Sequence, residues 1–245
     1  MPRMVGKLPP KRDDRTLLFE EYLSPRLAEP PARVDRESRV HRWPMYANDR
    51  LCDCTCAAAA HMVQSWTAYA RRREIVPEWR AVVASYYAIT GGRDEGAYCL
   101  DVLKHWRAAG VGGDRIAAFA QLRDRDSTQL KLAIDLFGSC YLGFALPDFA
   151  LHTRRRWDVP ASGSTGNARP NERNGHCVSV MGYDAAHLYI VTWGRLKAVT
   201  WAFFSAYMDE AYAVLSRDWL SAARKAPSGF GLRALRRDLE RLGGR

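Results

Sequence analysis

The sequence changes character near Cys140, and this change constrains the fold more than any other feature. Upstream of Cys140, Ala-rich and amphipathic stretches carry apolar residues at helical spacing. Downstream, short β-branched and aromatic runs alternate with turn residues, which is typical of an antiparallel sheet. We therefore expect an α+β protein in which a helical lobe is followed by an antiparallel β lobe.

Local patterns define the expected elements. Apolar periodicity predicts helices over residues 54–72, 77–89, 97–109 and 127–137, the last with Ser127 as its N-cap. Strands are predicted at CYLGFALP, HCVSVMGYD, LYIVTW and EAYAVLS. The stretch TLLFEEYL predicts a short helix of about two turns near the N-terminus. The Arg-rich segment from 153 to 173 predicts a surface loop, which either faces solvent or favours acidic partners.

Composition shifts divide the chain into an arm, a main domain and an extension. Residues 1–33 are charged and Pro-rich, as in an arm that packs along the body. Residues 34–215 form the main domain, with a mainly helical part at 34–137 and a β part at 138–215. Residues 216–245 predict a basic helical extension. Its apolar stripe is expected to dock on the body and consists of Leu232, Leu235, Leu239 and Leu242.

The charge balance is basic, with 37 Lys and Arg against 27 Asp and Glu and a formal net charge of +10. Such a charge admits nucleic acid as a partner, but the arginines are scattered and no nucleic-acid module is recognisable. No apolar run approaches the roughly 20 residues of a membrane span. The N-terminus has no apolar stretch of the kind found in a secretory signal. We therefore expect a cytoplasmic protein with reduced cysteines and no nucleic-acid or membrane partner.

Three cysteines crowd the start of the first predicted helix, at Cys52, Cys54 and Cys56. A thiol at a helix N-terminus is activated by the helix dipole and by free backbone N–H groups, which can also bind an oxyanion. Cys54 opens the helix, whereas Cys52 lies upstream in the loop and Cys56 faces the core. Cys54 is therefore the predicted nucleophile.

A cysteine nucleophile needs a base, and His176 stands between a Gly-preceded turn and a predicted strand. This position projects a side chain rigidly across a cleft. His61 points away from Cys54 and is interpreted as a packed or capping residue. A zinc site remains open as an alternative, although the single-residue gaps in CDCTC are unlike the usual Cys spacing of structural zinc. Its ligands would come from Cys52, Cys54, Cys56, His61, His176 and Cys177. We expect no metal and no cofactor.

Two stretches resemble the papain-like cysteine peptidase superfamily, in a divergent form of bacterial type. VDRESRVHRWPMYANDRLCDCTCAAAAH is similar to the family's nucleophile loop and helix, and NGHCVSVMGYD to its histidine strand. The resemblance implies a papain-like fold with the active site between the lobes, and it gives Asn48 the role of oxyanion donor. GGRDEGAYC resembles the Gly-rich cleft wall, so Gly91, Gly92 and Gly96 are expected to line the substrate cleft together with Cys52 and Asp53.

The sequence departs from this family where the histidine should be oriented. Aligning Trp193-Gly194 with the family's W-G motif places Val191 where an Asn is expected. Thr192 is one position along and would reach the ring only if the strand is shifted or bulged. Trp193 would still shield the Cys-His pair from water.

The resemblance and the residues together indicate a cysteine-dependent hydrolase that cleaves peptide or other amide bonds through an acyl-enzyme. A peptide or protein is then the expected substrate. A first alternative is a catalytically impaired papain-like domain that binds peptides or assembles with a partner. A second alternative is a zinc or redox protein built on the cysteine cluster.

Overall fold

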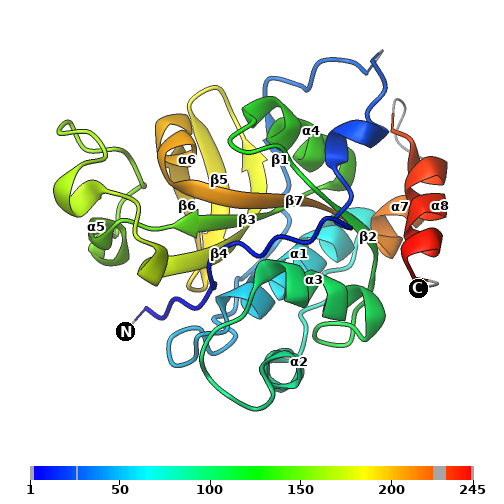
Figure 1. Cartoon of the computed structure of the whole chain (residues 1–245), viewed down its shortest axis with the longest axis horizontal. Helices are drawn as coiled ribbons and strands as arrows, with labels where there is room; N and C mark the ends of the chain where they lie inside the picture. The colour runs from blue at the N-terminus through cyan, green and yellow to red at the C-terminus, as the bar shows by residue number, and fades with distance from the viewer. Residues whose placement is uncertain (1–2, 26, 223–229, 244–245) are drawn as a thin grey trace.

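One antiparallel sheet forms the centre of the protein, and helices cover both of its faces (Figure 1). The computed structural model describes residues 3–25, 27–222 and 230–243. Within that part the sheet has seven strands in the order β2-β7-β3-β4-β5-β6, with β1 paired to β4. The strands are β1 (Val34–Asp35), β2 (Ile116–Gln121), β3 (Cys140–Ala145), β4 (Gly175–Tyr183), β5 (His187–Thr192), β6 (Arg195–Thr200) and β7 (Met208–Ser216).

Helices occur along the whole chain, and three of them lie between β1 and β2 in the sequence. The α-helices are α1 (Cys54–Ala70), α2 (Trp79–Thr90), α3 (Cys99–Ala108), α4 (Ser127–Phe137), α5 (Asp148–His152), α6 (Trp201–Tyr207), α7 (Arg217–Ala222) and α8 (Leu232–Gly243). Single 3-10 turns occur at η1 (Phe19–Tyr22), η2 (Gly166–Ala168) and η3 (Glu172–Asn174).

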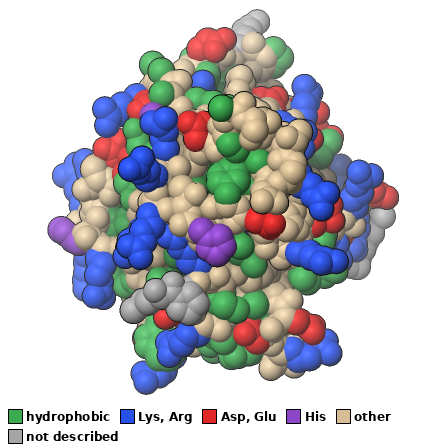
Figure 2. Space-filling model, turned by 90° about the vertical axis from the view of Figure 1, so that its left-hand side faces the viewer, with side chains coloured by type: hydrophobic (Ala, Val, Ile, Leu, Met, Phe, Trp, Pro, Cys, Tyr) green, Lys and Arg blue, Asp and Glu red, His purple; other side chains and the backbone are tan. Residues whose placement is uncertain are grey.

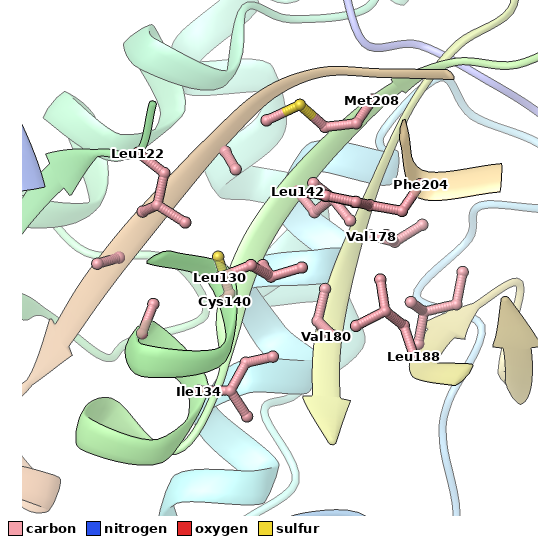
Figure 3. Packing of buried hydrophobic residues seen from close by; sticks show 14 of the residues in the cluster. Leu122, Leu130, Ile134, Cys140, Leu142, Val178, Val180, Leu188, Phe204 and Met208 are labelled. Atoms are coloured by element: carbon pink, nitrogen blue, oxygen red, sulfur yellow. The ribbon is translucent and has the colours of Figure 1, made fainter. Parts of the chain in front are cut away.

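The strand pleat divides the core into two hydrophobic clusters, because successive side chains point to opposite faces of a sheet. Val178 and Val180 of β4 belong to a cluster with α4 and α6, part of which Figure 3 shows. Cys177 and Met181 belong to the cluster beneath α1, α2 and α3. α1 thus packs directly on β4. This contact brings the predicted nucleophile and base onto neighbouring elements.

The helices predicted at 54–72, 77–89, 97–109 and 127–137 are present with ends shifted by at most a few residues. The predicted N-cap of the last one is wrong. Asp126 is the cap, since its side chain accepts a hydrogen bond from Gln129 N at 2.9 Å, and Ser127 is the first helical residue.

The part at 34–137, expected to be mainly helical, also contains a strand that was not predicted. Ile116–Gln121 forms β2, which pairs with β7 in register from Ala118 to Gln121. Its Ala-rich sequence favours a helix locally, but cross-strand pairing and burial decide its structure. β6 and α6 were not predicted either, and TLLFEEYL contains only the single turn Phe19–Tyr22.

The predicted loop from 153 to 173 is anchored in the core by Trp157. Its side chain is fully buried and stacks on Phe203 at a ring distance of 5.3 Å.

In the C-terminal extension, Leu232 and Leu235 are buried as predicted. The side chains of Leu239 and Leu242 lie outside the described residues. Among the described residues, no helix is long and apolar enough to cross a membrane.

Candidate active site

Cys54 is the first residue of α1, and its sulfur lies against β4. The amide N–H of Cys177 points to Cys54 Sγ at 3.4 Å. Tyr141 of β3 donates a hydrogen bond from its hydroxyl to the Thr55 carbonyl at 2.8 Å, which fixes the start of the helix on the sheet. The thiol therefore contacts the backbone of the residue next to His176.

His176 is buried at the start of β4 and is held on two sides. Its Nε2 lies 2.7 Å from Thr192 Oγ1, and its ring stacks on Trp193 with a centroid distance of 4.4 Å and an interplanar angle of 19°. Its Nδ1 has no hydrogen-bond partner in the described part of the chain. A neutral imidazole whose Nε2 is paired and whose Nδ1 is unpartnered has Nδ1 available to accept a proton.

The sheet register explains why Thr192 rather than Val191 meets the ring. Ser179 of β4 pairs with Val191 of β5, so their side chains share one face of the sheet. His176 lies an odd number of residues from Ser179 and points to the other face, which Thr192 shares. The register shift between Val180 and Gly182 comes after this pairing and does not disturb it.

A segment from the N-terminal arm lies across the site, as its dark blue trace between the sheet and α3 shows (Figure 1). Gly6 and Lys7 donate from their backbone N–H groups to the Gly175 carbonyl at 3.1 and 2.9 Å. On the opposite side, Ala97 N donates to Gly6 O at 2.8 Å and Leu8 N donates to Ala97 O at 3.1 Å. Residues 3–9, called here the covering segment, are thus bound to both walls of the cleft.

The fit of the covering segment is tight at Gly6. A Cβ added there would lie 2.0 Å from the Cys52 carbonyl oxygen, far inside van der Waals contact. Further along, Met4 N donates to Asn48 O at 3.2 Å, and Trp193 Nε1 donates to Met4 O at 2.8 Å. With the covering segment in place, Cys54 is only 1% exposed.

Two side chains of the covering segment reach opposite sides of the cleft. The Lys7 ammonium forms ion pairs with Asp209 at 2.8 Å and Glu210 at 3.1 Å. Burial alone would lower the pKa of Lys7, but nearby Cys99, Glu210 and Asp209 raise it above its usual range. Burial raises the pKa of Asp209 to about 6 despite the opposing charge of Lys7.

The Arg3 side chain lies in a basic groove on the other side of Cys54. Arg154, Arg155, Arg156, Arg195 and Lys197 line this groove. Burial, Arg3 and Arg195 together lower the pKa of Lys197 to about 8. Figure 2 shows Lys and Arg side chains gathered on the side of the molecule that includes α5.

Burial favours the uncharged forms of both Cys54 and His176. Burial raises the pKa of the Cys54 thiol. Burial, together with the charge on Lys7, lowers the pKa of His176 to about 3. Both shifts arise mainly from exclusion of water, which the covering segment helps to maintain.

The structure places Asn48 in the loop before α1, buried, with its Nδ2 donating to Leu51 O at 3.2 Å. Gly96 lies against the covering segment, since a Cβ there would come within 2.3 Å of Gly6 O. Gly92 lies in the exposed turn after α2, where an added Cβ would meet nothing within 4 Å. Cys52 contacts Gly6 through its carbonyl.

Asp53 is fully buried, and its carboxylate has no hydrogen-bond partner within the described ranges. Burial raises the pKa of Asp53 to about 8, so it is largely protonated at neutral pH. All six cysteines are free. No three His, Cys, Asp or Glu side chains of the described residues converge as metal ligands would.

Comparison with known proteins identifies the architecture. No family model and no curated protein sequence matches the chain. Among solved structures, it is similar to xylellain, a cysteine protease from Xylella fastidiosa, with a TM-score of 0.67 and 16% identity over 88% of this chain and 98% of xylellain. The chain has the papain-like fold.

Other structures with the papain-like fold match over most of the chain. A digestive procathepsin L 3 of Tenebrio molitor larval midgut has a TM-score of 0.59 and 11% identity, over 84% of this chain and 75% of that one. A Carica candamarcensis cysteine protease in complex with E-64 has a TM-score of 0.56 and 11% identity, over 76% of this chain and 99% of that one. The similarity to these structures therefore lies in the fold, since the sequences are only 11–16% identical.

Lys7, Asp209 and Glu210 were not identified from the sequence. The one local signal is the acidic pair that opens the otherwise apolar run of β7, where charges at buried positions require a partner. Nothing in the sequence connects this pair to a lysine near the N-terminus.

Proposed function

We propose that the protein is a cysteine-dependent hydrolase of peptide or other amide bonds, and that the covering segment keeps it latent. The orientation of His176 carries this proposal. Thr192 Oγ1 lies 2.7 Å from Nε2, Trp193 stacks on the ring, and Nδ1 has no hydrogen-bond partner among the described residues. This arrangement suits proton transfer from the thiol to Nδ1.

The chemistry proceeds by acyl transfer. The Cys54 proton moves to His176 Nδ1 as the sulfur bonds to the carbonyl carbon, and the π electron pair moves onto oxygen. Collapse of the tetrahedral intermediate breaks the C–N bond, and His176 gives its proton to the departing amine. A water then attacks the thioester, gives a proton to His176, and the C–S bond breaks to release the acid and restore the thiol.

The developing oxyanion needs donors at the start of α1. The backbone N–H of Cys54 is one donor, and the Asn48 amide is the other once it turns from Leu51 O. Loss of one such donor commonly lowers the rate about 10²- to 10³-fold. In this proposal the protein is a cytoplasmic enzyme that acts on peptide or protein substrates.

A Gly6→Val variant tests the proposal without changing any charge, because the added side chain collides with the Cys52 carbonyl and displaces the covering segment. Gly231→Ala is the matched control, since a Cβ there meets only ordinary contacts beginning at 3.4 Å. Alkylation of Cys54 by iodoacetamide, followed by mass spectrometry, should be fast at neutral pH in Gly6→Val and slow in wild type and Gly231→Ala.

The catalytic assignment is tested in the Gly6→Val background. His176→Ala should return the alkylation of Cys54 to the rate of an ordinary thiol, and Cys54→Ser should abolish peptide cleavage. A Gly6→Val protein that binds peptides but cleaves none, with Cys54 no faster than in His176→Ala, would show instead the impaired peptide-binding domain.

A further inference from the structure

The Lys7 side chain fills a closed pocket beside the nucleophile. Its exposure is 0%, and both of its carboxylate partners come from the start of β7. Glu210 is itself fixed, because Tyr212 donates a hydrogen bond from its hydroxyl to Glu210 Oε2 at 2.8 Å. The negative charges are therefore part of a rigid strand and not of a mobile loop.

The body of the protein, and not the covering segment, shapes this pocket. Gly143 of β3 lies opposite Glu210 of β7. A Cβ on Gly143 would come within 2.8 Å of Lys7 Cδ, of Asp209 Oδ1 and of Glu210 Cγ. The absence of a side chain at Gly143 thus leaves room for the stem of a long cation.

Displacement of the covering segment leaves the two neighbouring carboxylates of Asp209 and Glu210 without their cation, which is costly unless another cation replaces it. We propose that this pocket is a substrate subsite for the side chain of a Lys or Arg, and that Lys7 occupies it as a stand-in. The inference rests on the proposed hydrolase function and specifies its substrate class.

The contacts of the covering segment locate this subsite relative to the cleaved bond. Met4 lies against Trp193, Gly6 passes Cys52, and Lys7 lies beside Ala97. His176 must protonate the departing amine, and Trp193 stacks on it, so the Trp193 end accommodates the leaving group. The pocket then lies on the acyl side, within about two residues of the cleaved bond.

The same geometry explains why the covering segment is not a substrate in place. It enters from the Trp193 end, whereas a productive peptide would place its N-terminal residues toward Ala97. The covering segment therefore runs in the opposite direction to a substrate while using the same pocket.

Chemical rescue tests the pocket without requiring enzyme activity. The full-length Lys7→Ala protein is melted with and without n-butylammonium, which reproduces the end of the lysine side chain, and with n-butanol as the uncharged control. We expect n-butylammonium to raise the melting temperature of Lys7→Ala by several degrees and to leave wild type unchanged. The rise should disappear in Lys7→Ala/Glu210→Gln. An equal effect of n-butanol, or no effect of the amine, overturns the inference.

Peptide cleavage by the full-length Gly6→Val protein tests the substrate class. Blocked peptides carry either Lys or Met, which have similar stems, at each of the two positions before the cleaved bond. We expect kcat/KM to favour Lys at one position by at least about tenfold, and Glu210→Gln to bring the ratio near one. A ratio near one in Gly6→Val itself contradicts the subsite. Failure to cleave any peptide contradicts the proposed function, while the rescue measurement still decides the pocket.

Discussion

The covering segment is held by opposite means on the two sides of Cys54. On the acyl side, the Lys7 ammonium is fully buried in ion pairs with Asp209 and Glu210. On the leaving-group side, the Arg3 guanidinium is only partly buried, and it donates to backbone carbonyl oxygens at 2.7 and 3.1 Å. Lys7 therefore lies in a buried pocket of negative charge, whereas Arg3 binds only uncharged carbonyl groups.

The electrostatic surroundings of these two cations differ in sign. The pKa of Lys7 is raised above its usual range, whereas burial, Arg154 and Arg195 lower the pKa of Arg3. The pocket around Lys7 thus stabilises a positive charge, whereas the surroundings of Arg3 disfavour one. In our proposal the Lys7 side fastens the covering segment and selects substrates, while the Arg3 side is the end at which the covering segment opens.

The largest effect is expected for Lys7→Ala. Removal of one partner of a buried ion pair costs about 3–5 kcal/mol, because a charge is left buried without compensation. This cost destabilises the covered state and should accelerate alkylation of Cys54 by about 100- to 4,000-fold. The rate is measured by mass spectrometry at neutral pH.

Lys11→Ala is the matched control for Lys7→Ala. Lys11 also pairs with a carboxylate, that of Asp101 at 2.9 Å, but its side chain is 44% exposed. An exposed pair contributes at most about 1 kcal/mol, so the alkylation rate should hardly change. Equal effects of the two variants would show that the buried pair does not fasten the covering segment.

A smaller effect, dependent on pH, is expected for His176 on the leaving-group side. Its pKa in the folded protein is about 3, below the value of about 6.5 in an unfolded chain. The unfolded state therefore binds the proton first, and the stabilising contribution present above pH 6.5 is lost as the pH falls toward 3.

Comparison with His176→Gln isolates this contribution from other titrating groups. The unfolding free energy of wild type relative to the variant should be constant above pH 7 and should drop by about 3 kcal/mol at pH 4.5. Carboxyl groups with raised pKa, including Asp53, titrate in both proteins and cancel in the difference. Urea unfolding followed by tryptophan fluorescence measures it. A difference independent of pH would mean that the folded protein admits a charged imidazole.

A still smaller effect is expected at Thr192, which positions the base. Thr192→Val keeps the shape but removes the oxygen 2.7 Å from His176 Nε2. In the Gly6→Val background, kcat should fall by about 10- to 100-fold, which is part of what general base catalysis contributes. Thr192→Ser should restore most of the rate, and the pH profile should shift only in Thr192→Val. A loss that serine does not restore would indicate a packing role.

Thr192 illustrates which parts of the site the sequence predicts. Cys54 and the helix it opens follow from local patterns, and so does the strand that begins near His176. The choice between Val191 and Thr192 depends on which residues of β4 and β5 lie opposite each other. Register depends on how two strands pair, which a motif in one strand does not specify. Motif alignment therefore placed Val191, and not Thr192, at the position that orients the histidine.

The covering segment was beyond sequence reasoning for a different reason. Lys7 and Glu210 are about 200 residues apart, and neither belongs to a recognisable motif. Their pairing becomes visible only when the sheet places β7 beside the cleft. Similarly, β2 was missed because its Ala-rich sequence favours a helix until β7 pairs with it.

The smallest effect is expected for Arg3→Ala. The variant loses hydrogen bonds to Leu151 O and Thr153 O, but it also relieves repulsion from Arg154 and Arg195. These contributions oppose each other at a partly exposed site, so the net change should stay within about 1 kcal/mol and the Cys54 alkylation rate within about fivefold of wild type. An increase as large as that of Lys7→Ala would mean that both sides fasten the covering segment equally. A decrease that disappears in high salt would show that repulsion dominates at Arg3, since salt screens it.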